Sequence, residues 1–248
     1  MVLPLFIDSS AATATEGQSL VLGGEEAKHA ISVRRIRAGE SVQIADGRGH
    51  RAIGFVSEVG PKELTIQVTE FKSDPRPTLE LTLIQALAKG DRDELAIQAA
   101  TELGVMAVLP WQAKRSVSRW EGAKLAKGRE RWLSIVSEAA KQSLRSWVPE
   151  VLTPEDSNGL VKLFSKFDHV LVLEPTANVS LATQTSLRGS VALVVGPEGG
   201  IDSSELEIFE AFGAKLVHLG SGVLRTSTAG LAAISYLNAT AGLWNSAE

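Results

Sequence analysis

The chain has 248 residues, and 44% of them are hydrophobic. Its mean hydropathy is +0.07 and its formal net charge is −4. This composition is typical of a globular protein with one large domain or two smaller ones. The lack of cysteine excludes disulfides, a thiol nucleophile and cysteine metal ligands. No apolar run approaches the roughly 20 residues needed to span a bilayer, and the N-terminus lacks the basic segment of a secretory signal. We therefore expect a cytoplasmic protein.

Basic residues concentrate in one segment of an otherwise acidic chain. Residues 113–147 contain nine Lys or Arg against three Glu, whereas residues 148–248 contain five basic and eleven acidic side chains. Such a segment indicates one anionic partner at one surface, or an ordinary solvated helix face. Charge alone leaves both interpretations open.

The first seventy-odd residues have the pattern of a β-rich domain. Alternating segments at 41–47 and 50–59 are joined across Asp46-Gly47-Arg48-Gly49, a turn signal, and residues 63–71 form another alternating segment. The stiff polar stretch Ser73-Asp74-Pro75-Arg76-Pro77 follows. We place a domain boundary there, with one domain at 1–74 and another at 78–248.

The second part alternates short apolar runs with helical patterns. The apolar runs are expected to be strands buried on both faces, at 81–87, 105–111, 169–175, 191–197 and 215–220. Helices are expected at 93–103, within 121–147, at 203–212 behind an Asp202/Glu205 capping box, and at 226–243. Alternating strands and helices predict an α/β fold with a parallel sheet.

Three loops follow predicted strands, where open parallel sheets bind ligands. They are Glu174-Pro175-Thr176, the glycine-rich Gly196–Asp202 and Gly220–Thr226. Glycine lets the backbone approach a ligand closely, although tight turns also favour it. The sequence lacks the usual phosphate and dinucleotide motifs, and its four histidines have no metal-ligand spacing. We expect His218 to be a core residue and the two glycine-rich loops to form a ligand site without metal.

Several motifs follow one another along the chain in a known order. Two of them, residues 193–209 (LVVGPEGGIDSSELEIF) and 218–234 (HLGSGVLRTSTAGLAAI), resemble the C-terminal signature of the RsmE-type ribosomal RNA methyltransferases of the SPOUT superfamily. Residues 29–49 resemble the PUA-like RNA-binding domain of that family. Residues 89–105, 114–120 and 131–151 resemble its middle motifs. Ala99 and Ser227 depart from the pattern, at positions where lysine and glutamate are frequent. The resemblance implies a SPOUT-type, trefoil-knotted, parallel-sheet methyltransferase domain preceded by a small PUA-like β-barrel domain.

The resemblance also implies that the three loops bind S-adenosylmethionine. Carried over by position, the cofactor contacts come from all three loops and are Leu173, Glu174, Gly196, Glu198, Gly199, Gly200, Leu219, Gly220, Val223, Leu224 and Arg225. Leucine and valine side chains suit an apolar slot, and backbone groups suit an adenine edge. Glu198 is either a charge for the cofactor or RNA, or a helix N-terminal charge.

The family reaction is methylation of a uridine N3 in 16S rRNA of the 30S subunit. Because N3 carries a proton, we expect Arg225 to be the cation that stabilises the uridine anion, and Glu138 to be either a general base or an ordinary solvated helix residue. The expected RNA contacts are basic or amide side chains from both domains, namely Arg34, Arg35, Arg37, Lys114, Arg115, Arg119, Gln142 and Arg145. A homodimer is implied as well. The alternatives are a SPOUT methyltransferase acting on tRNA and a non-catalytic RNA-binding module of the same fold.

Overall fold

The computed structural model describes residues 2–245, and within it the chain forms two compact units. The first unit runs up to Arg76 and also contains Ala140–Val148. The second contains Pro77–Ala139 and the chain from Pro149 onward. Each unit has its own sheet and its own hydrophobic core.

The first unit is built on a five-stranded sheet with the order β1-β3-β4-β5-β2. Its strands are β1 (Leu5–Ile7), β2 (Ser19–Leu22), β3 (Ser41–Ala45), β4 (His50–Val59) and β5 (Leu64–Ser73). The three strands expected from alternation are confirmed as β3, β4 and β5, which pair antiparallel. The edge strands β1 and β2 were not predicted. Short helices complete the unit, namely η1 (Ser9–Thr13), α1 (Gly24–Lys28) and η2 (His29–Val33).

Trp147 anchors the late segment Ala140–Val148 within the first unit. Its indole Nε1 donates to the Asp74 carbonyl at 3.1 Å, and its ring lies over Gly49, where a Cβ would be only 2.6 Å away. Gly49 has a φ of +95°, so both the space and the backbone conformation require glycine. The Arg76 guanidinium lies 5.1 Å from the ring centroid. The end of the first unit is therefore built from residues far apart in sequence.

The second unit is built on a seven-stranded sheet in which every pair is parallel. The main order is β12-β10-β11-β6-β7-β8, and β9 pairs with β7. The strands are β6 (Leu79–Ala86), β7 (Ala107–Gln112), β8 (Glu150–Val151), β9 (Glu155–Asp156), β10 (His169–Leu173), β11 (Gly189–Val195) and β12 (Lys215–Val217). The five expected apolar strands are confirmed as β6, β7, β10, β11 and β12.

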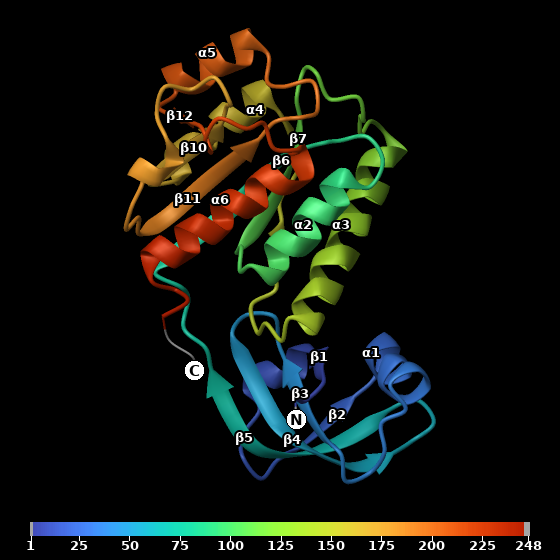
Figure 1. The fold of residues 1–248 in the computed structure, drawn as a ribbon. Coiled ribbons are helices and arrows are strands. Elements are labelled where there is room, and N and C mark those ends of the chain that lie inside the picture. The colour runs from blue at the N-terminus through green and yellow to red at the C-terminus, as the bar shows by residue number, and fades with distance from the viewer. Residues whose placement is uncertain (1, 246–248) are drawn as a thin grey trace. The chain divides into compact units, whose positions relative to one another are not determined.

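Helices cover the sheet of the second unit. They are α2 (Arg92–Glu102), α3 (Ala123–Gln142), α4 (Ser157–Val161), α5 (Ser203–Ala211) and α6 (Thr226–Ala241), with the 3₁₀ turns η3 (Phe164–Lys166) and η4 (Leu181–Thr183). Figure 1 shows α2 and α6 side by side, and both contact β6. One core cluster joins alternate residues of the central strands to α4, η3 and α5. No helix in the described part of the chain has the length and apolar character needed to cross a membrane.

Local sequence explains where α5 begins. The Asp202 carboxylate accepts from the Ser204 backbone, and the Glu205 carboxylate accepts from the Asp202 backbone, so the expected capping box is confirmed. The side chain of Glu205 is fully buried. It also accepts hydrogen bonds from the Lys114 backbone at 2.9 Å and from Ser157 Oγ at 2.5 Å. These bonds fix the end of the loop Gly196–Asp202 against the residues that follow β7 and against α4.

Candidate functional site

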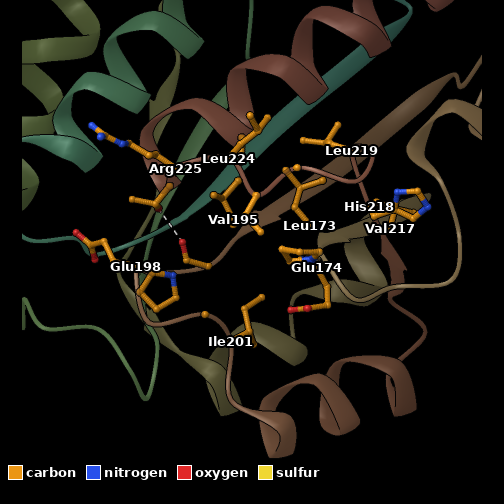
Figure 2. Close-up of a pocket in the computed structure, with 18 of the residues that line it drawn as sticks. Leu173, Glu174, Val195, Glu198, Ile201, Val217, His218, Leu219, Leu224 and Arg225 are labelled. Carbon is orange, nitrogen blue, oxygen red and sulfur yellow. Dashed lines mark hydrogen bonds between the residues drawn. The ribbon is translucent and has the colours of Figure 1, made fainter.

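A cavity of about 400 Å³ opens at the carboxyl ends of β10, β11 and β12 in the second unit. The loops that follow these three strands contribute most of its wall (Figure 2). The volume lies within the usual range for small-molecule sites. The three loops singled out in the sequence therefore meet at one place, as expected for ligand sites on open parallel sheets.

Nine of the eleven expected cofactor contacts line this cavity. They lie in the three loops or directly before them, and they are Leu173, Glu174, Gly196, Glu198, Gly200, Leu219, Val223, Leu224 and Arg225. Gly199 and Gly220 belong to the same loops but are not among the lining residues. A Cβ at Gly199 would lie 3.4 Å from Arg115 Cβ, so this glycine adjoins Arg115.

Gly196 is held by a short chain of hydrogen bonds. Thr226 Oγ1 donates to the Gly196 carbonyl at 2.7 Å, and Gln85 Nε2 donates to Thr226 Oγ1 at 2.8 Å. A Cβ at Gly196 would lie only 2.6 Å from Ile201 Cγ1, closer than packed atoms approach. The chain joins the ends of β6 and β11 to the start of α6, and glycine at 196 allows the loop to fold over Ile201.

Glu198 lies at the rim of the cavity in a small charged cluster. Its Oε1 accepts from the Lys89 backbone at 3.0 Å and from Arg92 Nη1 at 2.8 Å. Burial raises the pKa of Glu198, but the hydrogen bonds from backbone groups and Arg92 outweigh burial and the net pKa is lowered. Nearby, burial raises the pKa of Asp93 to about 6, against backbone hydrogen bonds from Ala88 and Glu94. Because its pKa is lowered and Arg92 lies against it, Glu198 is a charged carboxylate paired with a cation at neutral pH.

Lys114 and Arg115 contact the glycine-rich loop instead of standing free. Arg115 donates to the Gly199 carbonyl at 3.2 Å and to Asp202 Oδ2 at 3.1 Å. Lys114 Nζ donates to Ser204 Oγ and lies 3.8 Å from Asp202 Oδ1. The pKa of Asp202 is lowered by its bonds to Ser204 and by these two cations. Both residues were expected to hold phosphates, and the structure gives each a partner within its own unit.

The cavity has the chemistry that S-adenosylmethionine requires. Val223 and Leu224 line it and are 78% and 42% exposed as residues, so apolar surface is available to cover an adenosyl group. Glu174 lines it as well, and its Oε1 accepts from the Thr176 backbone and hydroxyl at 3.0 and 2.7 Å. These side chains and the loop backbones fit the cofactor. No cluster of metal-ligating side chains occurs among residues 2–245.

The two expected catalytic residues lie in different places. Arg225 is exposed, lines the cavity and has no side-chain partner among the described residues. Glu138 is an exposed residue of α3 and does not line the cavity. The cavity thus contains the expected cation without the expected base.

The other expected RNA contacts differ in exposure. Arg34, Arg35 and Arg37 are all exposed in the first unit, and none has a side-chain partner in the described chain. Arg119 is exposed and donates to the Lys114 carbonyl at 3.4 Å, and Gln142 is exposed at the end of α3. Arg145 is partly buried and donates to the Trp147 carbonyl at 3.3 Å. Burial lowers the pKa of Arg145 to about 10.

Three polar residues of the cavity wall were not among the expected contacts, although Thr226 ends one of the predicted loops. Arg92 begins α2, Thr226 begins α6, and His218 directly follows β12. The expectation that His218 is a core residue is wrong, because it is only partly buried and its Nδ1 accepts from the Gly220 backbone at 3.0 Å. The position of His218 just after a strand was the available signal. Nothing in the local pattern around Arg92 indicated that it would reach the cavity.

Comparison with known proteins agrees with this geometry. A model of the RNA methyltransferase domain matches residues 74–238, and a model of the RNA methyltransferase PUA domain matches residues 22–69. The chain is 40% identical over 234 residues to ribosomal RNA small subunit methyltransferase E of Mycobacterium tuberculosis, covering 92% of this chain and 89% of the relative. It is 31% identical over 242 residues to the protein of that name from Bacillus subtilis, covering 94% of each.

Solved structures give the same result. The ribosomal RNA small subunit methyltransferase E of Neisseria gonorrhoeae, bound to S-adenosylmethionine, superposes with a TM-score of 0.85 at 28% identity, covering 96% of this chain and 98% of that chain. A Legionella pneumophila protein solved with the same cofactor also has a TM-score of 0.85 at 29% identity, covering 95% and 96%.

The fold and the cavity define an RNA methyltransferase with a PUA domain followed by a SPOUT methyltransferase domain. The expected fold class is thereby confirmed. Within that class, the chain belongs to the RsmE family of small-subunit ribosomal RNA methyltransferases.

Proposed function

We propose that this protein uses S-adenosylmethionine to methylate N3 of a uridine in 16S rRNA. The observation that carries the proposal is the cavity at the carboxyl ends of β10, β11 and β12, lined by nine of the expected cofactor contacts. Relatives that share the fold at TM-scores of 0.85 were solved with this cofactor, and the curated relatives are named as small-subunit rRNA methyltransferases. The bound cofactor supplies an electrophilic methyl group on a sulfonium centre.

In this proposal the chain's own residues position the base and favour loss of its N3 proton. Arg225 stands in the cavity wall without a partner in the described chain, so it is available to a developing anion. Glu138 remains our proposed general base, to be supplied at the cavity by a second copy of the chain because it does not line the cavity of its own chain. The target base must be unpaired or flipped out of its stack.

We assign RNA binding mainly to the cations that have no partner in the described chain, with 1–74 as the PUA-like RNA-binding domain and 78–248 as the trefoil-knotted methyltransferase domain. Three arginines of the first domain support this assignment most directly. Arg34, Arg35 and Arg37 are exposed, and their side chains have no hydrogen-bond or ion-pair partner within the described residues, so they are available to phosphates. The exposed apolar side chains of Val223 and Leu224 are consistent with a homodimer whose interface adjoins the cavity. The proposed setting is the cytoplasm, where ribosomal subunits are assembled.

The test supplies labelled S-adenosylmethionine with assembled 30S subunits, protein-free 16S rRNA or tRNA, and maps the modified nucleoside. We expect N3-methyluridine in 16S rRNA, and more of it from 30S subunits than from naked rRNA. Label in tRNA, or no transfer despite cofactor binding, would select the two alternatives respectively. A Lys162→Ala variant, altered at an exposed residue outside this cavity, serves as the control and should match the wild type.

A further inference from the structure

Arg92 has an unusual position in the cavity wall. All other lining residues belong to the loops after β10, β11 and β12, to the ends of those strands or to α6, within the described chain. Arg92 instead is the first residue of α2 and directly follows the loop that joins β6 to α2. It therefore reaches the cavity from outside the set of loops that forms the expected cofactor site.

The guanidinium of Arg92 is held at one nitrogen and open at the others. Its Nη1 donates to Glu198 Oε1 at 2.8 Å, and the Glu198 carboxylate is itself fixed by the Lys89 backbone. The Arg92 side chain is 45% exposed, and its Nε and Nη2 have no partner among residues 2–245. An arginine is permanently charged and presents several N–H donors in a planar fork. Glu198 thus orients a cation whose remaining donors are available to another molecule.

We propose that Arg92 contacts the target uridine and, together with Arg225, stabilises the anion formed when N3 loses its proton. The inference rests on the proposed uridine-N3 reaction. Transfer of the N3 proton to the general base, proposed above as Glu138 of a second copy, leaves a negative charge shared by N3 and its two neighbouring carbonyl oxygens. The N3 electron pair then forms the new bond to the methyl carbon, while the carbon–sulfur bond breaks and its electrons remain on sulfur. Donors placed where this charge develops stabilise the anion, so they lower the free energy of the deprotonation that must precede methyl transfer.

Glu198 acts through Arg92 in this arrangement and is a positioning residue. A carboxylate that accepts from two donors and has a lowered pKa is a poor proton acceptor. Its side chain is 25% exposed, which leaves less access for substrate than the Arg92 side chain has. The pair therefore contributes a fixed positive charge at the rim of the cavity, and the role of base falls to another group.

The test compares Arg92→Ala, Arg92→Lys and Glu198→Gln with the wild type and with Lys162→Ala as control. Single-turnover methylation of 30S subunits is measured across pH, and cofactor affinity is measured by calorimetry. Removing one such donor should lower the rate about 10²-fold, with cofactor affinity changed less than twofold. Arg92→Lys should retain part of the rate because it retains the charge, and Glu198→Gln should lose less than Arg92→Ala.

Two further readouts separate anion stabilisation from a structural role. The deficit of Arg92→Ala should shrink as pH rises, because more of the uridine is deprotonated without help. Reconstituted 30S subunits containing 5-fluorouridine should recover part of the lost rate, since the electron-withdrawing fluorine makes N3–H more acidic. Replacing uridine by 5-fluorouridine should not restore the rate of a variant whose fold is damaged.

Three results would overturn the inference. One is a normal saturated rate in Arg92→Ala with cofactor affinity reduced tenfold or more, which would make Arg92 a cofactor contact. Another is a rate loss that is constant across pH and unrelieved by 5-fluorouridine. The third is a wild-type rate in Arg92→Ala. Failure of the wild type to form N3-methyluridine would contradict the proposed function itself, and the wild-type reaction reports this separately.

Discussion

Two groups of cations that look alike in the sequence have different surroundings in the structure. Arg34, Arg35 and Arg37 of the first unit are exposed, and their side chains form no hydrogen bond or ion pair in the described chain. Lys114 and Arg115 of the second unit are also exposed, yet both contact the glycine-rich loop or the start of α5. Basic residues therefore have to be divided into those free to meet RNA and those that already hold part of the protein.

The second group clamps the loop Gly196–Asp202, which carries four of the expected cofactor contacts, Gly196, Glu198, Gly199 and Gly200. Arg115 holds the carbonyl of Gly199 and the carboxylate of Asp202, and Lys114 holds Ser204 beside it. Charged hydrogen bonds of this kind are stronger than neutral ones, although their exposure weakens them. We therefore expect the free group to govern RNA affinity and the clamping group to govern cofactor affinity.

The largest effect should come from removing the free group. We expect Arg34→Ala, Arg35→Asn and Arg37→Ala combined to weaken RNA binding on the order of 10²-fold at moderate salt and to reduce the salt slope by about 2 to 3. Asparagine is chosen at 35 because Arg35 has a φ of +55°. Filter binding at several salt concentrations measures this. Lys62→Ala, an exposed cation of the same unit, is the control. An unchanged RNA affinity in the triple variant would remove the first unit from the RNA site.

Loss of the clamp should act on the cofactor instead. We expect Arg115→Ala to weaken S-adenosylmethionine binding about tenfold, equivalent to about 1.4 kcal/mol, because the Gly199 carbonyl and Asp202 lose a common donor. RNA affinity and its salt slope should change little. Calorimetry and filter binding on the same preparation check both. If Arg115→Ala weakens RNA binding and leaves cofactor affinity normal, the assignment of Arg115 to the clamping group is wrong.

Neutralising Asp202, which pairs with Lys114 and Arg115, should change cofactor affinity and RNA affinity by smaller amounts and in opposite directions. Asp202→Asn keeps the side-chain oxygen that caps α5 but removes the charge facing Lys114 and Arg115. We expect cofactor binding to weaken about threefold and RNA binding to strengthen slightly, since two cations are released toward solvent. Circular dichroism should show an unchanged helix content. Weaker RNA binding by this variant would contradict the division between the two groups.

The smallest effect is expected from pH. The pKa of Asp202 is lowered from its ordinary value of 3.8 by hydrogen bonds from Ser204 and by Arg115 and Lys114. A lowered pKa in the folded state means that the contribution is complete above the ordinary value and is lost only as pH falls through the lowered one. The ratio of cofactor affinities between wild type and Asp202→Asn should therefore vary less than twofold from pH 5 to pH 8. A ratio that falls steadily toward pH 5 would mean that the carboxylate is already being protonated.

Most regular elements could be predicted because their signals are local. The apolar run at 191–197 and the capping box at Asp202 and Glu205 each lie within a few residues, and they correspond to β11 and the start of α5. β1 (Leu5–Ile7) could not be found in this way. It has only three residues and is defined by pairing with β3, about forty positions later.

The site was predictable to the extent that its residues lie in the three loops. Glycine and the ends of apolar runs marked those loops, and the family resemblance assigned their ligand. Arg92 and the clamping role of Arg115 were missed because both depend on contacts across about a hundred residues. A basic side chain in a sequence carries no sign of which carboxylate it will meet. Such pairing is decided by the strand order, which no local pattern specifies.

The packing of Trp147 on Gly49 has a consequence for how this protein can be divided and inherited. The first unit is completed by Ala140–Val148, which follows Pro77–Ala139 of the other unit along the chain. A gene fragment that ends near Arg76 would encode an incomplete unit, with the surface around Gly49 left uncovered. The unit therefore cannot be exchanged between proteins as one continuous cassette. Recombination that moves it intact must carry the second segment too, and with it the intervening part of the second unit.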